Sequence, residues 1–205
     1  DEKIFVAVNV VDTDARLKQV DAHYLLNSQQ SKENDRFNIL FVGAMEPNKK
    51  VDVLISALHQ LSNKNYNVGL HLIGDGSARR ELEKLSAKLN ISDRVHFYGK
   101  VAGPLAPKVC SMDVFVMLIV AMVAIALRLC HGVPVLCGIG DGCEGDLITG
   151  ENGKVLANTN VDTLVKELSV LIESPSLLVK MKENAKKTVD TYNINTYIAS
   201  ISEAI

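Results

Sequence analysis

The chain contains no tryptophan, and aromatic residues make up only 5% of its 205 residues. Proteins that bind single-stranded nucleic acid stack bases on aromatic side chains, so this composition argues against that function. The formal net charge is −2 at pH 7, which lacks the basic excess of a nucleic-acid-binding surface. The sequence therefore predicts no nucleic-acid partner.

Closely spaced cysteine pairs and bilayer-length apolar runs are absent too. The four cysteines are Cys110, Cys130, Cys137 and Cys143, and no pair has the spacing of a zinc knuckle. The apolar neighbours of these cysteines predict buried free thiols. The histidines do not have the spacing of metal ligands, so we expect no metal site, and we expect no cofactor. The first residues, DEKIFVAVNV, lack the basic region and cleavage site of a signal peptide, which with free thiols predicts a cytoplasmic protein. The longest apolar run, residues 114–127, is too short to span a bilayer.

From residue 37 onward, short apolar runs alternate with amphipathic ones. The expected strands are 38–42, 68–73, 95–98, 113–118, 133–137 and 154–156. The expected helices are 51–62, 78–89, 105–110, 119–130, 161–172 and 177–192. Alternating strands and helices predict an α/β fold with a doubly wound parallel sheet and helices at its C-terminal end. Residues 3–11 read as a further strand and 27–35 as a linker, so we divide the chain into 1–36 and a domain 37–205.

The stretch from 113 to 153 predicts where a ligand binds. A buried strand, a buried helix and a second buried strand lead into a loop rich in glycine and acids, as at the carboxyl ends of parallel strands. Residues 138–142 follow a strand, but no convincing helix follows them, so they are not a dinucleotide fingerprint. Glu144 and Asp146 are the candidate acids, since carboxylates accept hydrogen bonds from sugar hydroxyls. The alternative is that both are solvated loop acids.

A second candidate loop follows the strand 38–42. Lys49 and Lys50 come just before a helix N-terminus, where amide donors and the helix dipole favour an anion such as phosphate. The alternative is two solvated surface lysines. Gly43, which ends the strand, permits close approach of the backbone to a ligand. Ser77 is a candidate N-cap of the following helix.

Five short motifs carry a family resemblance. In order, they are FVGAMEPNKKVDVLI (41–55), LIGDG (72–76), RVHFYG (94–99), GVPV (132–135) and GENG (150–153). Together they resemble the C-terminal, donor-binding domain of retaining GT-B glycosyltransferases of family 4, the glycogen synthase and mannosyltransferase type. The likeness runs from about residue 37 to the end, and VNVVD at 8–12 is similar to the family's interdomain stretch.

The resemblance implies the Rossmann-like half of a GT-B fold that holds a nucleotide-sugar donor. Gly43 and Lys49 would meet the donor diphosphate, and the grip on the phosphate would rest mainly on Lys49, with Lys50 as a second cation. The backbone from Tyr98 to Val101 would hold the base. Glu144 or Asp146 would be the acid of the late loop. The implied reaction transfers a sugar with retention to a sugar, lipid or protein acceptor, and cationic groups would stabilise the departing diphosphate without a metal.

Three departures from the family pattern leave an alternative open. The acceptor-binding domain is missing, and with it half of the cleft and any peripheral membrane contact that it provides. Ala44 stands in the place of an arginine, and Ile119 and Leu127 stand where the family has glutamates, whose hydrogen bonds apolar residues cannot make. The alternative is therefore a degenerate, non-catalytic GT-B-like module that binds a nucleotide or a partner. A third hypothesis is that the sequence of residues 118–129 is wrongly assigned or altered, because it is the only stretch that contradicts the family pattern around it.

Overall fold

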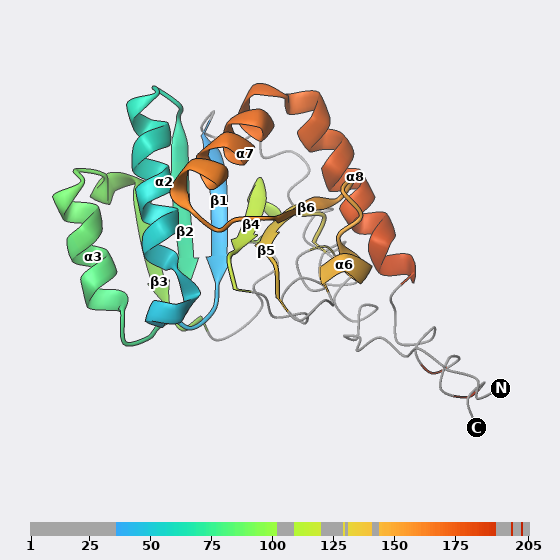
Figure 1. Cartoon of the computed structure of the whole chain (residues 1–205), viewed down its shortest axis with the longest axis horizontal. Helices are drawn as coiled ribbons and strands as arrows, with labels where there is room; N and C mark the ends of the chain where they lie inside the picture. Colours follow the sequence, from blue (N-terminus) through green and yellow to red (C-terminus); the bar gives the residue numbers. More distant parts are fainter. Residues whose placement is uncertain are drawn as a thin grey trace.

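The structure is a computed structural model that describes residues 36–101, 109–119, 129, 131–140, 144–191, 198 and 202. Its strands form one six-stranded sheet in the order β3-β2-β1-β4-β5-β6, and every pairing is parallel (Figure 1). The strands are β1 (Phe37–Val42), β2 (Val68–Ile73), β3 (Val95–Gly99), β4 (Val114–Met117), β5 (Val135–Gly138) and β6 (Gly153–Leu156). The predicted doubly wound parallel sheet is confirmed.

The helices follow from apolar periodicity. They are α2 (Val51–Asn63), α3 (Arg79–Lys88), α6 (Glu144–Leu147), α7 (Val161–Glu173) and α8 (Pro175–Thr191), with 3-10 turns η1 (Pro47–Lys49) and η2 (Ser92–Arg94). Figure 1 shows α2, α3 and α7 covering one face of the sheet, and α2 packs directly on α7. The buried face of α2 joins the core through Leu54, Ile55, Leu58 and Leu61, as a stripe of 3.6-residue period predicts.

Both faces of the central strands are buried. Ile39 and Phe41 of β1 belong to the core beneath α2 and α7, whereas Leu40 belongs to a second core on the opposite face. Successive side chains of a strand point to opposite faces, so burial on both sides explains the unbroken apolar run of β1. From β1 the chain proceeds to β2 and β3 on one side, then crosses to β4 on the other. The carboxyl ends of β1 and β4 thus mark the switch point where ligands bind in such folds.

Several local expectations were wrong. A short helix, α6, follows the glycine-rich loop where none was expected. α8 begins at Pro175, two residues before the expected start at 177, because the missing N–H of proline is tolerated at the first position of a helix. Ser77 does not cap α3, whose N-cap is Ala78.

Other expectations lie wholly or mostly outside the described residues: the strand 3–11, the linker 27–35 and the helices 105–110 and 119–130. In the described part of the chain, no helix has the length and apolar character needed to cross a membrane.

Candidate functional site

Backbone contacts join the turns that follow β1, β2 and β3. The Gly43 N–H donates to the Ile73 carbonyl at 3.0 Å, and the Gly74 N–H donates to the Gly99 carbonyl at 2.8 Å. Gly74 has φ +131°, and a Cβ there would lie 1.9 Å from the Gly43 carbonyl oxygen. Only glycine fits at position 74, because any side chain would clash with Gly43. The absence of a side chain there lets the turn after β2 lie directly against Gly43 at the end of β1.

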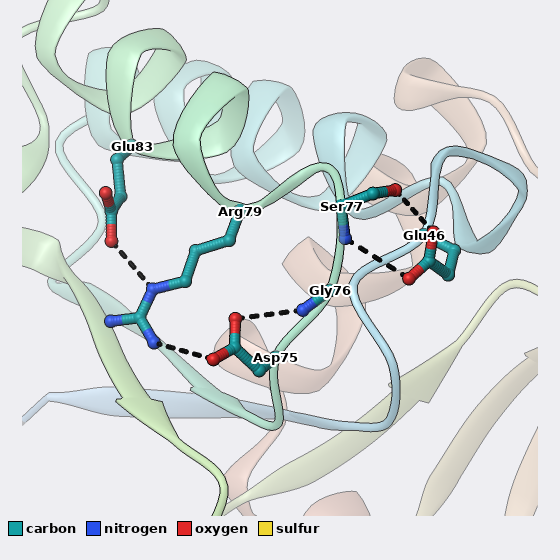
Figure 2. A network of polar contacts seen from close by, with 6 residues as sticks. All are labelled: Glu46, Asp75, Gly76, Ser77, Arg79 and Glu83. Atoms are coloured by element: carbon teal, nitrogen blue, oxygen red, sulfur yellow. Dashed lines mark hydrogen bonds and ion pairs between the residues drawn. The ribbon is translucent and has the colours of Figure 1, made fainter.

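The loop between β1 and α2 is anchored to the turn before α3. Met45, which is fully buried, donates its N–H to the Asp75 carbonyl at 2.9 Å and accepts from the Ala78 N–H at 2.9 Å. The Glu46 carboxylate accepts from the Ser77 hydroxyl and from the Ser77 N–H (Figure 2). These hydrogen bonds, the hydroxyl one first, lower the pKa of Glu46. The loop that carries the lysines therefore has a defined shape.

Arg79 continues this polar network along the first turn of α3. Its Nε donates to Glu83 at 2.9 Å, and its Nη1 lies 3.7 Å from the Asp75 carboxylate (Figure 2). The other Asp75 oxygen accepts from the Gly76 N–H at 2.9 Å. The guanidinium also lies 5.9 Å from the centre of the Phe97 ring. Arg79 is thus a structural cation that ties α3 to β3 and to the β2 turn.

Lys50 differs from Lys49 in its backbone conformation and in the hydrogen bonds that it makes. Lys49 ends η1, and its N–H donates to the Glu46 carbonyl at 2.9 Å. Lys50 adopts the left-handed conformation, with φ +55°, at the N-cap of α2, where no side-chain hydrogen bond caps the helix. Its ammonium Nζ donates to the Thr159 hydroxyl at 2.7 Å. The half-buried Lys50 side chain therefore reaches across to the loop between β6 and α7.

Thr159 brings Lys50 to the end of β5. A Cβ at Gly138 would lie 2.6 Å from the Thr159 methyl carbon and 2.2 Å from the Leu118 carbonyl oxygen. The ends of β4 and β5 and the β6–α7 loop are therefore in contact at this point. The structure thus brings Lys50, from the loop between β1 and α2, close to Gly138, where the glycine-rich loop begins, at the carboxyl edge of the sheet.

The two candidate acids have different surroundings. Glu144, at the start of α6, is only 4% exposed, and its Oε1 accepts from the Gly140 N–H at 2.8 Å. Asp146, further along α6, is exposed. Burial raises the pKa of the Cys137 thiol to about 11, with the Glu144 charge as a smaller cause. Glu144 therefore holds the glycine-rich loop at Gly140 and is not a solvated acid, whereas Asp146 is exposed.

Asn152 holds the segment after α6. It is fully buried, and its Nδ2 donates to the Leu147 carbonyl at 2.8 Å and to the Thr188 hydroxyl at 2.7 Å. Its Oδ1 accepts from the Thr149 N–H at 3.0 Å. Because Leu147 ends α6 and Thr188 lies in α8, this amide joins the end of α6 to α8.

The segment from Tyr98 to Val101 lies on the other side of β1. β3 is an edge strand separated from β1 by β2. The Tyr98 hydroxyl is 2.9 Å from His71 Nδ1, and burial raises the pKa of Tyr98. The Gly99 carbonyl accepts from Gly74, and Val101 is 41% exposed. The side chain of Tyr98 thus contacts β2, while Lys50 reaches toward β5.

Sequence reasoning missed Thr159, and it included Asn152 only within the GENG motif, without a role. Asn160 carries a local signal, since its side chain accepts from the Thr163 N–H at 2.9 Å as the N-cap of α7. That signal predicts where α7 begins, but nothing local relates Thr159 to a lysine 109 residues away. Within the part of the chain that the structure describes, no group of three or more His, Cys, Asp or Glu side chains could hold a metal ion.

Curated relatives of the chain are glycosyltransferases. Alpha-D-kanosaminyltransferase of Streptomyces kanamyceticus is 26% identical over 182 residues, which cover 85% of this chain and 44% of the relative. A GDP-mannose-dependent alpha-(1-6)-phosphatidylinositol monomannoside mannosyltransferase of Mycolicibacterium smegmatis is 25% identical over 177 residues, covering 80% of this chain and 46% of the relative. The chain therefore spans less than half the length of either protein.

Solved glycosyltransferase structures share the fold. Anabaena HepE in complex with UDP superposes with a TM-score of 0.77 at 19% identity, over 98% of this chain and 56% of that chain. A glycosyltransferase from Rickettsia africae gives a TM-score of 0.76 at 17% identity, over the same shares of both chains. The six-stranded parallel sheet is thus the Rossmann-like architecture of GT-B glycosyltransferases. Residues 26–188 match the family described as Glycosyl transferases group 1, and because this match covers more than half of the chain, the protein belongs to that family.

Proposed function

We propose that the domain formed by residues 37–205 binds the nucleotide-sugar donor of a family 4, retaining glycosyltransferase. The observation that carries this proposal is the Lys50 ammonium, held 2.7 Å from Thr159 at the carboxyl edge of the sheet. Family membership supports the proposal, as do solved structures of Anabaena HepE with UDP and with UDP-glucose. Residues 1–36 would connect to an acceptor domain, because the relatives are about twice as long as the matched region.

The charges and the backbone suit a diphosphate leaving group. Lys50, with Lys49 beside it, would neutralise charge that develops on the diphosphate as the sugar departs. Gly43 would let the backbone approach the donor, and Asp146, which is exposed, would accept hydrogen bonds from sugar hydroxyls. Glu144 would act through the loop that it holds at Gly140. The backbone from Tyr98 to Val101 would hold the base.

The acceptor would be a sugar, lipid or protein, and the reaction would take place in the cytoplasm. Any peripheral membrane contact would come from the acceptor domain. A second candidate function, a degenerate module without catalysis, is favoured by Ile119. This residue follows β4 at the switch point, where an apolar side chain cannot bind a sugar hydroxyl.

Calorimetry with UDP, GDP, UDP-glucose and GDP-mannose tests the donor site. We expect Lys50→Met to weaken diphosphate binding about 10- to 100-fold, the value of one lost charge-assisted hydrogen bond. Lys49→Met measures the contribution of the neighbouring cation in the same way. Lys84→Met is the matched control, since Lys84 is 74% exposed on α3, where it pairs with Glu81.

Two results would contradict the proposal. One is the absence of binding by the unmodified chain at millimolar concentrations of all four nucleotides. The other is an equal loss of affinity in Lys84→Met and Lys50→Met, which would show that the loss comes from the change in net charge and not from the position of Lys50. Binding of UDP together with failure to bind any nucleotide sugar would favour the degenerate module.

A further inference from the structure

The backbone of Lys50 is unusual in this chain. Among the described residues, the non-glycine residues with positive φ are Lys50, Asn65 and Asn90. Asparagine tolerates the left-handed conformation because its short side chain bonds locally, whereas lysine has no such compensation. Glycine at position 50 would adopt φ +55° without this penalty. A strained residue at a ligand-binding edge suggests that its side chain has a use.

That side chain is held by one specific partner. The Lys50 ammonium donates to the Thr159 hydroxyl at 2.7 Å in a partly buried hydrogen bond. A lysine ammonium has three N–H donors, so two remain for other acceptors. A free lysine samples many rotamers, and the bond reduces this freedom before a ligand arrives. Pre-ordering of a cation in this way increases affinity for an anion.

Thr159 is itself fixed on both sides. Its methyl carbon lies 2.6 Å from the position that a Gly138 Cβ would take, so the side chain fills the space above the end of β5. The next residue, Asn160, caps α7 through the Thr163 N–H at 2.9 Å, which holds the backbone at the start of the helix. Thr159 is therefore a rigid support between Gly138 and the Lys50 ammonium.

We propose that Thr159 is a positioning residue that holds the Lys50 ammonium for the diphosphate of the donor. The inference rests on the proposed donor-binding function and adds the residue through which the lysine is oriented. Thr159 acts through Lys50, so its effect requires the lysine and a ligand that carries a diphosphate. A role in stability alone would show neither dependence.

The test compares Thr159→Val, which keeps the shape and removes the hydroxyl, with Thr159→Ser, which keeps the hydroxyl. We expect Thr159→Val to weaken binding of UDP and of inorganic pyrophosphate about fivefold, the value of one ordinary hydrogen bond. Thr159→Ser loses the methyl that packs at Gly138 but keeps the hydroxyl, so it should bind both ligands more tightly than Thr159→Val does. Binding of uridine, which has no phosphate, should be unchanged in both variants. In a Lys50→Met background, Thr159→Val should have no further effect.

The outcomes separate this inference from the proposed function. If the unmodified chain and Thr159→Val bind UDP equally well, the positioning role is overturned and the donor site is left in place. An equal loss on Thr159→Val with and without Lys50 also overturns it, because the effect would not pass through the lysine. Failure of the unmodified chain to bind both UDP and pyrophosphate overturns both proposals. Thermal unfolding of each variant shows whether a loss of affinity reflects a loss of folded protein.

Discussion

Replacing Gly74 with alanine is expected to lower the free energy of unfolding by about 3 kcal/mol or more. The new Cβ would lie 1.9 Å from the Gly43 carbonyl oxygen, a backbone atom that cannot move without disturbing the end of β1. The φ of +131° adds a second penalty, because side chains other than glycine rarely adopt it. Thermal unfolding should show a midpoint lower by roughly 10 °C for a domain of this size.

Three other glycines separate the two causes. Gly150→Ala isolates the backbone penalty, since Gly150 has φ +83° but no atom within 4 Å of a new Cβ. Gly76→Ala isolates the contact, since its Cβ would lie 2.5 Å from the Met45 carbonyl oxygen at an ordinary φ. Gly145→Ala is the neutral control, with nothing within 4 Å. Stability of Gly74→Ala equal to that of Gly145→Ala would show that the β1 and β2 turns are not in contact in solution.

Asp113→Ala is expected to lower the free energy of unfolding by about 3 kcal/mol, because it leaves a buried donor and a cation without a partner. Asp113 is fully buried. One carboxylate oxygen accepts from the Asn38 N–H at 2.9 Å, and the other accepts from Lys182 Nζ at 2.8 Å. The residue thus joins the start of β1 and the start of β4 to α8. Urea unfolding with an unchanged m-value would measure the loss.

The Asp113 prediction has its own controls. Asp113→Asn keeps the shape and one acceptor oxygen, which can still accept from the Asn38 N–H, but it turns an NH2 donor toward Lys182. It therefore measures loss of the charge interaction without the cavity that alanine leaves. Lys84→Ala removes a pair whose two side chains are each 74% exposed and should change stability by less than about 1 kcal/mol. Asp113 precedes β4 at the amino edge, away from Lys50, so folded Asp113→Asn should bind UDP as the unmodified chain does. Alanine and asparagine variants as stable as the unmodified chain would contradict the structural role.

Much of the fold was predictable because its causes are local. The apolar run of β1 and the stripe through Leu54, Ile55 and Leu58 of α2 identify a strand buried on both faces and a helix buried on one. Alternation of such units admits few topologies, and the parallel sheet follows. α6 escaped prediction because four residues carry no periodicity, and the capping signal of Ser77 was misleading because its hydroxyl bonds Glu46 instead.

The candidate site was predictable only in part. The pattern of glycines, lysines and acids identified which loops gather at the carboxyl edge, because parallel strands end at the same edge of a sheet. The resemblance favoured Lys49, whereas it is Lys50 whose ammonium the structure holds against Thr159. The pattern also did not distinguish buried Glu144 from exposed Asp146. Those differences arise from a φ angle and from contacts between distant segments, which neighbouring residues do not specify.

The amino-acid sequence by itself determined the parallel sheet and the longer helices α2, α3, α7 and α8, since burial of apolar side chains and short right-handed connections act at the level of each segment. Its five short motifs indicated the glycosyltransferase family by resemblance. Tertiary structure decided the chemistry of the edge: that Lys50 bonds Thr159, that Glu144 holds Gly140, and that Gly74 must lie against Gly43. The physical reason is the distance over which each effect acts. A hydrophobic pattern involves residues that are close together in the sequence. A hydrogen bond or a close backbone contact requires atoms within about 3 Å, and residues far apart in the sequence reach that distance only when the chain folds.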